Sequence, residues 1–64
     1  ERALQSLAPK YREVLILKDV EELAYEEIRE ILRLPITTLK IRVVRARAMM
    51  REALEAMSAG DTSE

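Results

Sequence analysis

Leu34–Arg51, with the sequence L-P-I-T-T-L-K-I-R-V-V-R-A-R-A-M-M-R, is the stretch from which the rest of the chain is best interpreted. It carries one lysine and four arginines, and residues 35–51 contain no aspartate or glutamate. The net charge is +5 over residues 35–51, −2 over residues 1–34 and −4 over residues 52–64, so a whole-chain charge of −1 hides a local basic segment. Charged helix surfaces usually mix both signs. Five cations without an acid therefore indicate more than a solvated helix face.

The same stretch has the apolar period of a long helix that begins behind a proline. Pro35 suits a helix start, where its missing N–H would have no partner. We expect this helix to run from Ile36 to about Ala56 or Met57, with Gly60 and the polar residues after it ending the helix. The apolar stripe expected to face the core consists of Leu39, Val43, Ala46, Met50, Ala53 and Met57. The opposite face carries Thr37, Lys40, Ile41, Val44, Arg45 and Ala48, with Arg42 and Arg47 on its flanks.

Three further helices are predicted before this one, over Arg2–Leu7, about Pro9–Val20 and about Ala24–Leu32. The third lacks a Ser or Thr cap, because Ala24 stands there, at a cost of about 1 kcal/mol. Only residues 33–35 separate it from the last helix, which is helix-turn-helix spacing. The sequence thus predicts an all-α, four-helix domain over residues 1–57, with a C-terminal helix-turn-helix, a long recognition helix and a disordered tail over 58–64.

An apolar excess marks the second predicted helix at Val14, Leu15, Ile16 and Leu17. Four consecutive residues sweep roughly 300° of a helix surface, and one core cannot accept all four. Two explanations stay open: the helix is central and surrounded by its neighbours, or one of these residues faces a partner.

Several classes of function are disfavoured by composition. The chain has 64 residues, no cysteine and no histidine, which excludes disulfides, zinc fingers and histidine-based catalysis. The pairs Glu21-Glu22 and Glu26-Glu27 have no obvious pocket to perturb them, so we expect no enzyme, cofactor or metal site. No apolar run approaches a membrane span, and the absence of cysteine is consistent with a cytoplasmic location. The chain begins at Glu1 without methionine, and we expect it to be part of a longer protein.

The side chains on the exposed face of the last predicted helix have the chemistry of DNA recognition. Lys40 can donate to guanine O6 and N7, and Ile41 and Val44 can pack on thymine methyl groups. Thr37 and Thr38 can reach a base or a phosphate, and the flanking arginines can bind phosphates. The alternative is a helical protein-interaction module, in which this face binds another protein.

Three segments carry a family resemblance over about Leu4 to Leu54. They are L-x-x-L-A-P-K-Y-R-E-V-L-x-L, then Y-E-E-I-x-E-I-L, then L-P-x-x-T-L-K-x-R-x-x-R-A-R. Together they resemble region 4 of bacterial sigma factors, most closely the extracytoplasmic-function type. A similar four-helix layout occurs in the effector domain of response regulators, but that domain usually has a histidine shortly after its T-V-K, and this chain has none.

The resemblance implies a domain that reads the promoter −35 element as part of a sigma factor directing RNA polymerase to promoters. It also implies docking on the flap of the polymerase β subunit, masking by an anti-sigma factor, and a monomeric isolated domain. The family positions that face bases fall on Ile36, Thr37, Lys40, Ile41 and Val44. Those that face phosphates fall on Thr38, Arg42, Arg45 and Arg47. The flap surface of the family uses the first helices, which would give Val14, Ile16 and Leu17 a purpose.

The chain departs from the family pattern at three positions. Arg33 stands where relatives usually have a turn glycine, and it costs about 1 kcal/mol if its φ is positive. Ile41 replaces a small polar residue, so one polar base contact is lost and the DNA sequence cannot be copied from a relative. Ala24 replaces a helix-start serine. These changes leave the fold intact and bear on binding strength.

Overall fold

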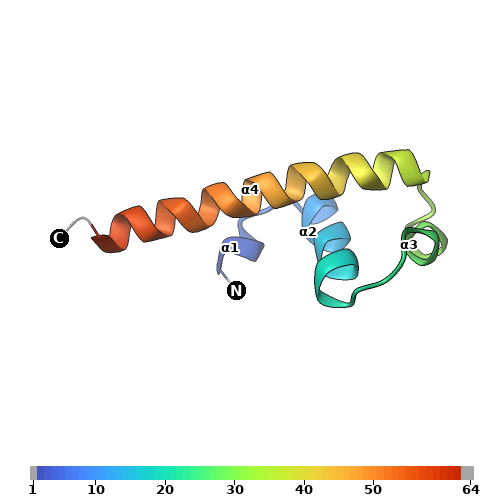
Figure 1. Ribbon diagram of the computed structural model, residues 1–64, viewed down its shortest axis with the longest axis horizontal. Coiled ribbons are helices and arrows are strands. Elements are labelled where there is room, and N and C mark those ends of the chain that lie inside the picture. Colours follow the sequence, from blue (N-terminus) through green and yellow to red (C-terminus); the bar gives the residue numbers. More distant parts are fainter. Residues whose placement is uncertain (1, 63–64) are drawn as a thin grey trace.

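The regular elements in the described part of the chain are all helices, as Figure 1 shows. The computed structural model describes residues 2–62, with side chains over residues 2–58. Its elements are α1 (Arg2–Gln5), α2 (Pro9–Leu15), the π-helix η1 (Ile16–Val20), α3 (Tyr25–Leu32) and α4 (Ile36–Thr62). This arrangement confirms the predicted all-α fold with four α-helices, of which the last is the longest.

The helix α4 runs the length of the molecule, and the other helices lie along one side of it (Figure 1). The overall dimensions are 46 × 18 × 16 Å. The most extensive packing is between α2 and α4. In Figure 1 α3 is seen nearly end-on while α4 lies horizontal, so the two helices of the helix-turn-helix cross steeply. The last turns of α4 extend beyond α1 and the rest of the body.

Two small apolar clusters hold these helices together. One consists of Val14, Ile28, Leu39 and Val43, each at most 1% exposed, and it joins α2, α3 and α4. The other consists of Leu7, Leu15 and Ala46, with Met50 partly buried against it. The stripe predicted on α4 is confirmed at its first three positions, because Leu39, Val43 and Ala46 all lie in these clusters. Burial of a single Leu or Ile contributes about 1.5–3 kcal/mol.

The apolar excess of the second helix is explained by its central position. Val14 and Leu15 point into different clusters, whereas Ile16 and Leu17 are half-buried. The helix covers Pro9–Val20 as predicted, but its last five residues form the π-helix η1. The N–H of Glu21 donates to the carbonyl of Ile16 over 2.9 Å, which is the i→i+5 spacing of a π turn.

Both turns that flank α3 contain a residue in left-handed geometry. Arg33 has φ 59° and ψ 43°, and its N–H donates to the carbonyl of Arg29 over 2.8 Å, which closes the helix end. The conditional cost of about 1 kcal/mol predicted for Arg33 therefore applies. Glu22, with φ 60°, is a second such residue, which sequence reasoning missed.

At the start of α3 the Glu27 carboxylate accepts from the Ala24 N–H over 2.8 Å. Ala24 has no side-chain acceptor to return that bond, so this start is weakly capped, as predicted.

The predicted end of the last helix is wrong. The helix α4 continues to Thr62 instead of ending at Ala56 or Met57. A single glycine in a helix costs only about 1 kcal/mol relative to alanine, and no proline follows Gly60 to enforce a stop. The division into a domain over 1–57 and a disordered tail over 58–64 stays a prediction, and residues 63–64 lie outside the described part of the chain.

Candidate nucleic-acid interface

The predicted base-reading residues lie on one exposed side of the first turns of α4, which we call the reading face (Ile36, Thr37, Lys40, Ile41 and Val44). The last four side chains are exposed and that of Ile36 is half-buried. Ile41 is 52% and Val44 65% exposed, although both are β-branched apolar residues. Two such side chains one helical turn apart favour contact with an apolar surface outside the domain.

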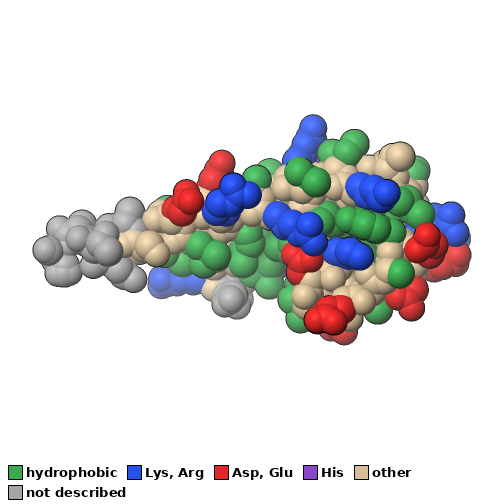
Figure 2. Space-filling model, in the orientation of Figure 1, with side chains coloured by type: hydrophobic (Ala, Val, Ile, Leu, Met, Phe, Trp, Pro, Cys, Tyr) green, Lys and Arg blue, Asp and Glu red, His purple; other side chains and the backbone are tan. Residues whose placement is uncertain are grey.

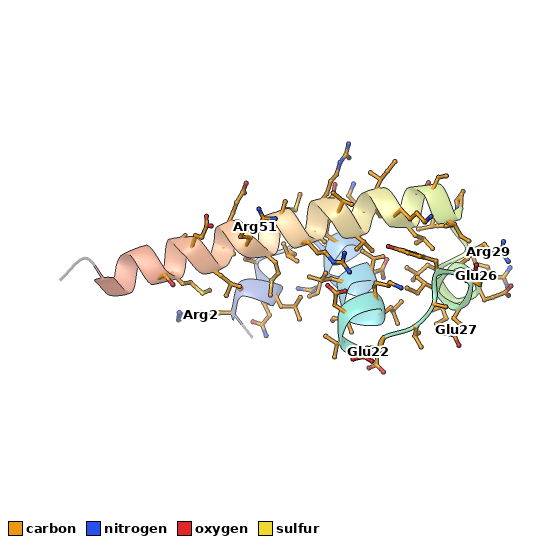
Figure 3. The ribbon with its side chains drawn as sticks, in the orientation of Figure 1. Arg2, Glu22, Glu26, Glu27, Arg29 and Arg51 are labelled. Atoms are coloured by element: carbon orange, nitrogen blue, oxygen red, sulfur yellow. The ribbon has the colours of Figure 1, made fainter. Side chains whose placement is uncertain are left out.

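The predicted phosphate-contacting residues lie beside this face, but their environments differ. Arg45 is exposed, and Thr38 and Arg42 are half-buried. Within residues 2–58, Arg42 and Arg45 have no ion-pair partner. Figure 2 shows basic side chains gathered over the N-terminal half of α4 and the elements just beneath it. In Figure 3 the acidic residues Glu22, Glu26 and Glu27 lie below α4. Residues 36–51 of α4 contain no acidic residue of their own.

Arg47, the fourth predicted phosphate contact, is already bound within the domain. Its Nε donates to one carboxylate oxygen of Asp19 over 3.0 Å and its NH2 nitrogen donates to the other over 2.6 Å. Both side chains keep contact with solvent, at 50% and 38% exposure. The hydrogen bond from Arg47 lowers the pKa of the Asp19 carboxyl below its ordinary value of 3.8, against the opposing effect of partial burial. A phosphate could recruit Arg47 only by competing with this bidentate pair.

Tyr25 connects three elements on the side of the molecule next to the reading face. The Lys18 Nζ of η1 lies 4.3 Å from the Tyr25 ring centroid, and the Lys40 Nζ of α4 lies 5.6 Å from it. Lys18 also donates to the carbonyl of Leu23 over 3.2 Å. Both lysines are within the roughly 6 Å at which a cation interacts favourably with an aromatic ring.

The predicted partner surface needs a correction. Val14 is 0% exposed in the core, because α2 is packed against both α3 and α4, so Val14 cannot contact a partner. Ile16 and Leu17 are half-buried. An apolar hollow lies elsewhere, between α1, η1 and the C-terminal half of α4, with a volume of about 750 Å³. We call this the α1–α4 groove; it is lined by Leu4, Leu15, Asp19, Val20, Arg47, Met50, Arg51, Leu54, Glu55 and Ser58. Figure 3 shows Arg51 on α4 and Arg2 on α1, both toward this end of the molecule.

Sequence reasoning missed the Asp19–Arg47 pair, the Tyr25 contacts and the α1–α4 groove. Asp19 and Arg47 are 28 positions apart, so no local spacing links them. Tyr25 carried a usable signal, because the chain has only two aromatic residues and this one begins a helix. Val20 and Leu54, the exposed apolar residues of the groove at 65% and 49%, were recoverable only from the packing of α1 on α4.

Other site types find no support in the part of the chain that the structure describes. No group of three or more acidic residues is placed to hold a metal ion there. None of the described helices combines the length and the hydropathy needed to cross a membrane.

A family profile described as "Sigma-70, region 4" matches residues 1–50. The chain is 41% identical over 54 residues to the ECF RNA polymerase sigma factor SigW of Bacillus subtilis, a match that covers 84% of this chain and 29% of that protein. It is 39% identical over 54 residues to the ECF RNA polymerase sigma factor SigE of Mycolicibacterium smegmatis, which covers 84% of this chain and 21% of that protein. The chain thus spans less than a third of the length of either relative. No solved structure matches it.

Proposed function

Because the chain belongs to the sigma-70 region 4 family, we propose that α4 binds the −35 element of promoters and so helps a sigma factor direct RNA polymerase. Region 4 is a helix-turn-helix domain of transcription initiation and not an enzyme. The family match also sets aside the response-regulator alternative.

The observation that carries this proposal is the reading face itself. It lies on the second helix of the helix-turn-helix, which is the helix that enters the major groove in such motifs. It combines a lysine, exposed Ile41 and Val44, and no acidic residue. Apolar side chains are costly to leave in water, and thymine methyl groups in the major groove give them a contact surface. A purely solvated helix face would not need them.

A salt titration tests whether the domain binds DNA through phosphates. Binding of a labelled promoter duplex is measured by fluorescence anisotropy at several salt concentrations. About three to five phosphate contacts predict a slope of log K against log[salt] of roughly −3 to −4. A slope near zero would contradict DNA binding and would favour the interaction-module alternative.

Two variants separate base reading from phosphate contact. Lys40→Ala should reduce discrimination at one base pair by about 1–3 kcal/mol, because a donor pair to guanine is lost. Arg45→Ala should weaken binding to matched and scrambled duplexes alike and make the salt slope shallower by about one. Equal losses on both duplexes for Lys40→Ala would refute its base-reading role.

We further propose that the α1–α4 groove receives the flap of the polymerase β subunit. The groove lies toward the C-terminal end of α4, while the reading face lies at its N-terminal end, so both partners can be bound together. Its apolar floor and its charged rim of Arg51 and Glu55 suit an amphipathic helix. Half-buried Ile16 and Leu17 remain the family-implied contacts on the first helices, and an anti-sigma factor is proposed to compete for the same area.

Binding of a fragment of the β-subunit flap to the domain is measured by isothermal titration calorimetry. Leu54→Glu should abolish flap binding, because it places a charge on the apolar floor, and should leave DNA affinity unchanged. Glu52→Ala, also exposed on α4 but outside the groove, is the matched control. Sedimentation should show a monomer for both variants and for the parent chain. Unchanged flap binding by Leu54→Glu would place the flap elsewhere.

A further inference from the structure

We propose that Tyr25 is a positioning residue for Lys40, so that the first helix of the helix-turn-helix sets the direction from which a residue of the second helix approaches the DNA. This inference rests on the proposed function, because it concerns how base reading by Lys40 is achieved. Nothing in the family match assigns this role to the ring.

The contacts form a chain across three elements. The Lys18 ammonium lies 4.3 Å from the Tyr25 centroid and donates to the Leu23 carbonyl over 3.2 Å, so it spans the turn between η1 and α3. The Tyr25 ring is half-buried against the cluster of Val14, Ile28, Leu39 and Val43. The ring is therefore held by the core on one side and by Lys18 across the turn.

Lys40 is the solvent-exposed member of this set of contacts. Its side chain is exposed, and it has no ion-pair partner among residues 2–58. The Tyr25 ring, 5.6 Å from its Nζ, is the contact that the structure provides for the ammonium group. A lysine has up to about 2 kcal/mol of rotamer entropy to lose when it is ordered. A ring that already restricts Lys40 in the free domain reduces what must be lost on DNA.

The ring also keeps the Lys40 charge available. A carboxylate at this position would bind the ammonium strongly and compete with the base edge. A ring attracts it only weakly, by an interaction that DNA can replace. Lys18, nearer to the same ring, repels the second cation and so disfavours a fully stacked Lys40. The ring thus holds Lys40 nearby by a weak attraction, and repulsion from Lys18 keeps the Lys40 donors free.

The inference is tested by a double-mutant cycle between Tyr25 and Lys40. Discrimination is measured as the ratio of Kd values for duplexes that differ only at the base pair where Lys40→Ala loses its preference. Tyr25→Leu should reduce this ratio about two- to five-fold, as expected for one cation–ring contact. Tyr25→Phe, which keeps the ring, should retain it. Tyr25→Leu should have no further effect on the ratio in a Lys40→Ala background.

Two outcomes would overturn the inference while leaving the proposed function intact. If Tyr25→Leu weakens binding to every duplex alike, Tyr25 acts on the fold or on phosphates in general. If Tyr25→Phe loses as much as Tyr25→Leu, the hydroxyl is the active group. Thermal unfolding of each variant checks that a loss of discrimination is not a loss of folded protein.

A measurement without DNA separates the two proposals. In the free chain the ε-methylene protons of Lys40 should show an upfield ring-current shift that disappears in Tyr25→Leu and persists in Tyr25→Phe. Absence of this shift overturns the positioning role directly. If the shift is present but Lys40→Ala loses preference at no base pair, the base-reading proposal has failed, and the positioning role fails with it.

Discussion

Arg33 and Glu22 are the two residues, within the described range 2–62, whose backbone geometry conflicts with their side chains. Both have φ near +60°, a region in which a Cβ atom approaches the backbone and glycine carries no penalty. Arg33 supplies the left-handed residue that ends α3 and turns the chain toward α4. Among residues 2–58 neither side chain forms a hydrogen bond or ion pair that would offset this cost.

Arg33→Gly should therefore stabilise the domain by about 0.5–1 kcal/mol, since relief of the left-handed strain exceeds the added chain entropy of glycine. Chemical unfolding at neutral pH gives the free energy of unfolding. Glu22→Gly should behave in the same way. Arg29→Gly, inside α3 with ordinary helical geometry, is the control and should destabilise by about 1 kcal/mol.

The Asp19–Arg47 pair gives a pH dependence with a defined sign. The hydrogen bond from Arg47 lowers the pKa of Asp19 in the folded state below 3.8, so the unfolded state binds the proton more tightly. The stabilisation is complete above the ordinary value of 3.8 and is lost as the pH falls through the lowered folded value. Since both groups are more than a third exposed, it amounts to about 0–1 kcal/mol.

Asp19→Asn should accordingly lower the free energy of unfolding by a constant small amount above about pH 5, and the difference should shrink as the pH falls below 4. Glu30→Gln, which removes one exposed carboxylate elsewhere, is the control.

Asp19→Asn should also tighten DNA binding to all duplexes, because it frees Arg47 to contact a phosphate. Adding Arg47→Ala to Asp19→Asn should cancel that gain in affinity. A gain that survives Arg47→Ala would mean that Arg47 plays no part in phosphate binding.

At the scale of elements, α3 is held mainly by one side chain. Ile28 is 0% exposed and joins Val14, Leu39 and Val43. In a chain of 64 residues, one such contact is a large fraction of the total stability. Loss of Ile28 would loosen the first helix of the helix-turn-helix and, through it, the placement of α4.

Ile28→Ala should cost about 2–5 kcal/mol of stability through the lost burial and the cavity it leaves. Denaturant titration followed by circular dichroism measures the loss. Ile31→Ala removes the same atoms from a side chain that is 55% exposed and should cost far less. Similar losses for both variants would contradict the burial seen for Ile28.

Sequence periodicity predicted the helices because each presents a consistent apolar face. It placed α3 and the start of α4 correctly, and it identified Leu39, Val43 and Ala46 as buried. Periodicity could not decide which residue of Val14–Leu17 faces the core, because four consecutive apolar residues cover most of a helix surface. The family resemblance then placed Val14 on a partner surface, and its burial contradicts that assignment. The helix end at Met57 was placed too early, because a lone glycine is a weak stop signal.

The candidate site, like the fold, was predicted only in part from the sequence. Exposed residues of the reading face follow from the 3.6-residue period once the buried stripe is known. The partners of Arg47 and Lys40 do not, because both contacts cross between elements that only the tertiary packing brings together. The π turns of η1 had no sequence signal, and they lie just where Asp19 reaches α4.

At the scale of the whole molecule, a net charge of −1 gives little general attraction to DNA. Under the proposed function, DNA binding would come from the local positive segment of α4, which has acidic regions on either side of it in sequence. Within a longer sigma factor, a second promoter contact would raise the effective concentration of this domain at its site.

The isolated chain should therefore bind its −35 duplex with a Kd weaker than about 10⁻⁶ M near 0.15 M salt. Anisotropy titration gives this value. Holoenzyme assembled with the full sigma factor should bind promoter DNA at least about a hundred-fold more tightly, as tethering of two contacts allows. Nanomolar binding by the isolated chain would show that no second contact is needed.

Because α4 is long, a small rotation at one of its ends produces a large displacement at the other end. Lys40 of the reading face and Leu54 of the α1–α4 groove are on one continuous helix, and at 1.5 Å per residue they are about 21 Å apart. A rotation of only about 5° around the groove would carry the reading end through roughly 2 Å. That displacement is several times the range of donor–acceptor distances over which a hydrogen bond to a base stays favourable. Under the proposed function, a protein bound in the groove would therefore set the orientation of α4 as well as its location. Small differences in how that protein holds the helix would then change which promoters are read.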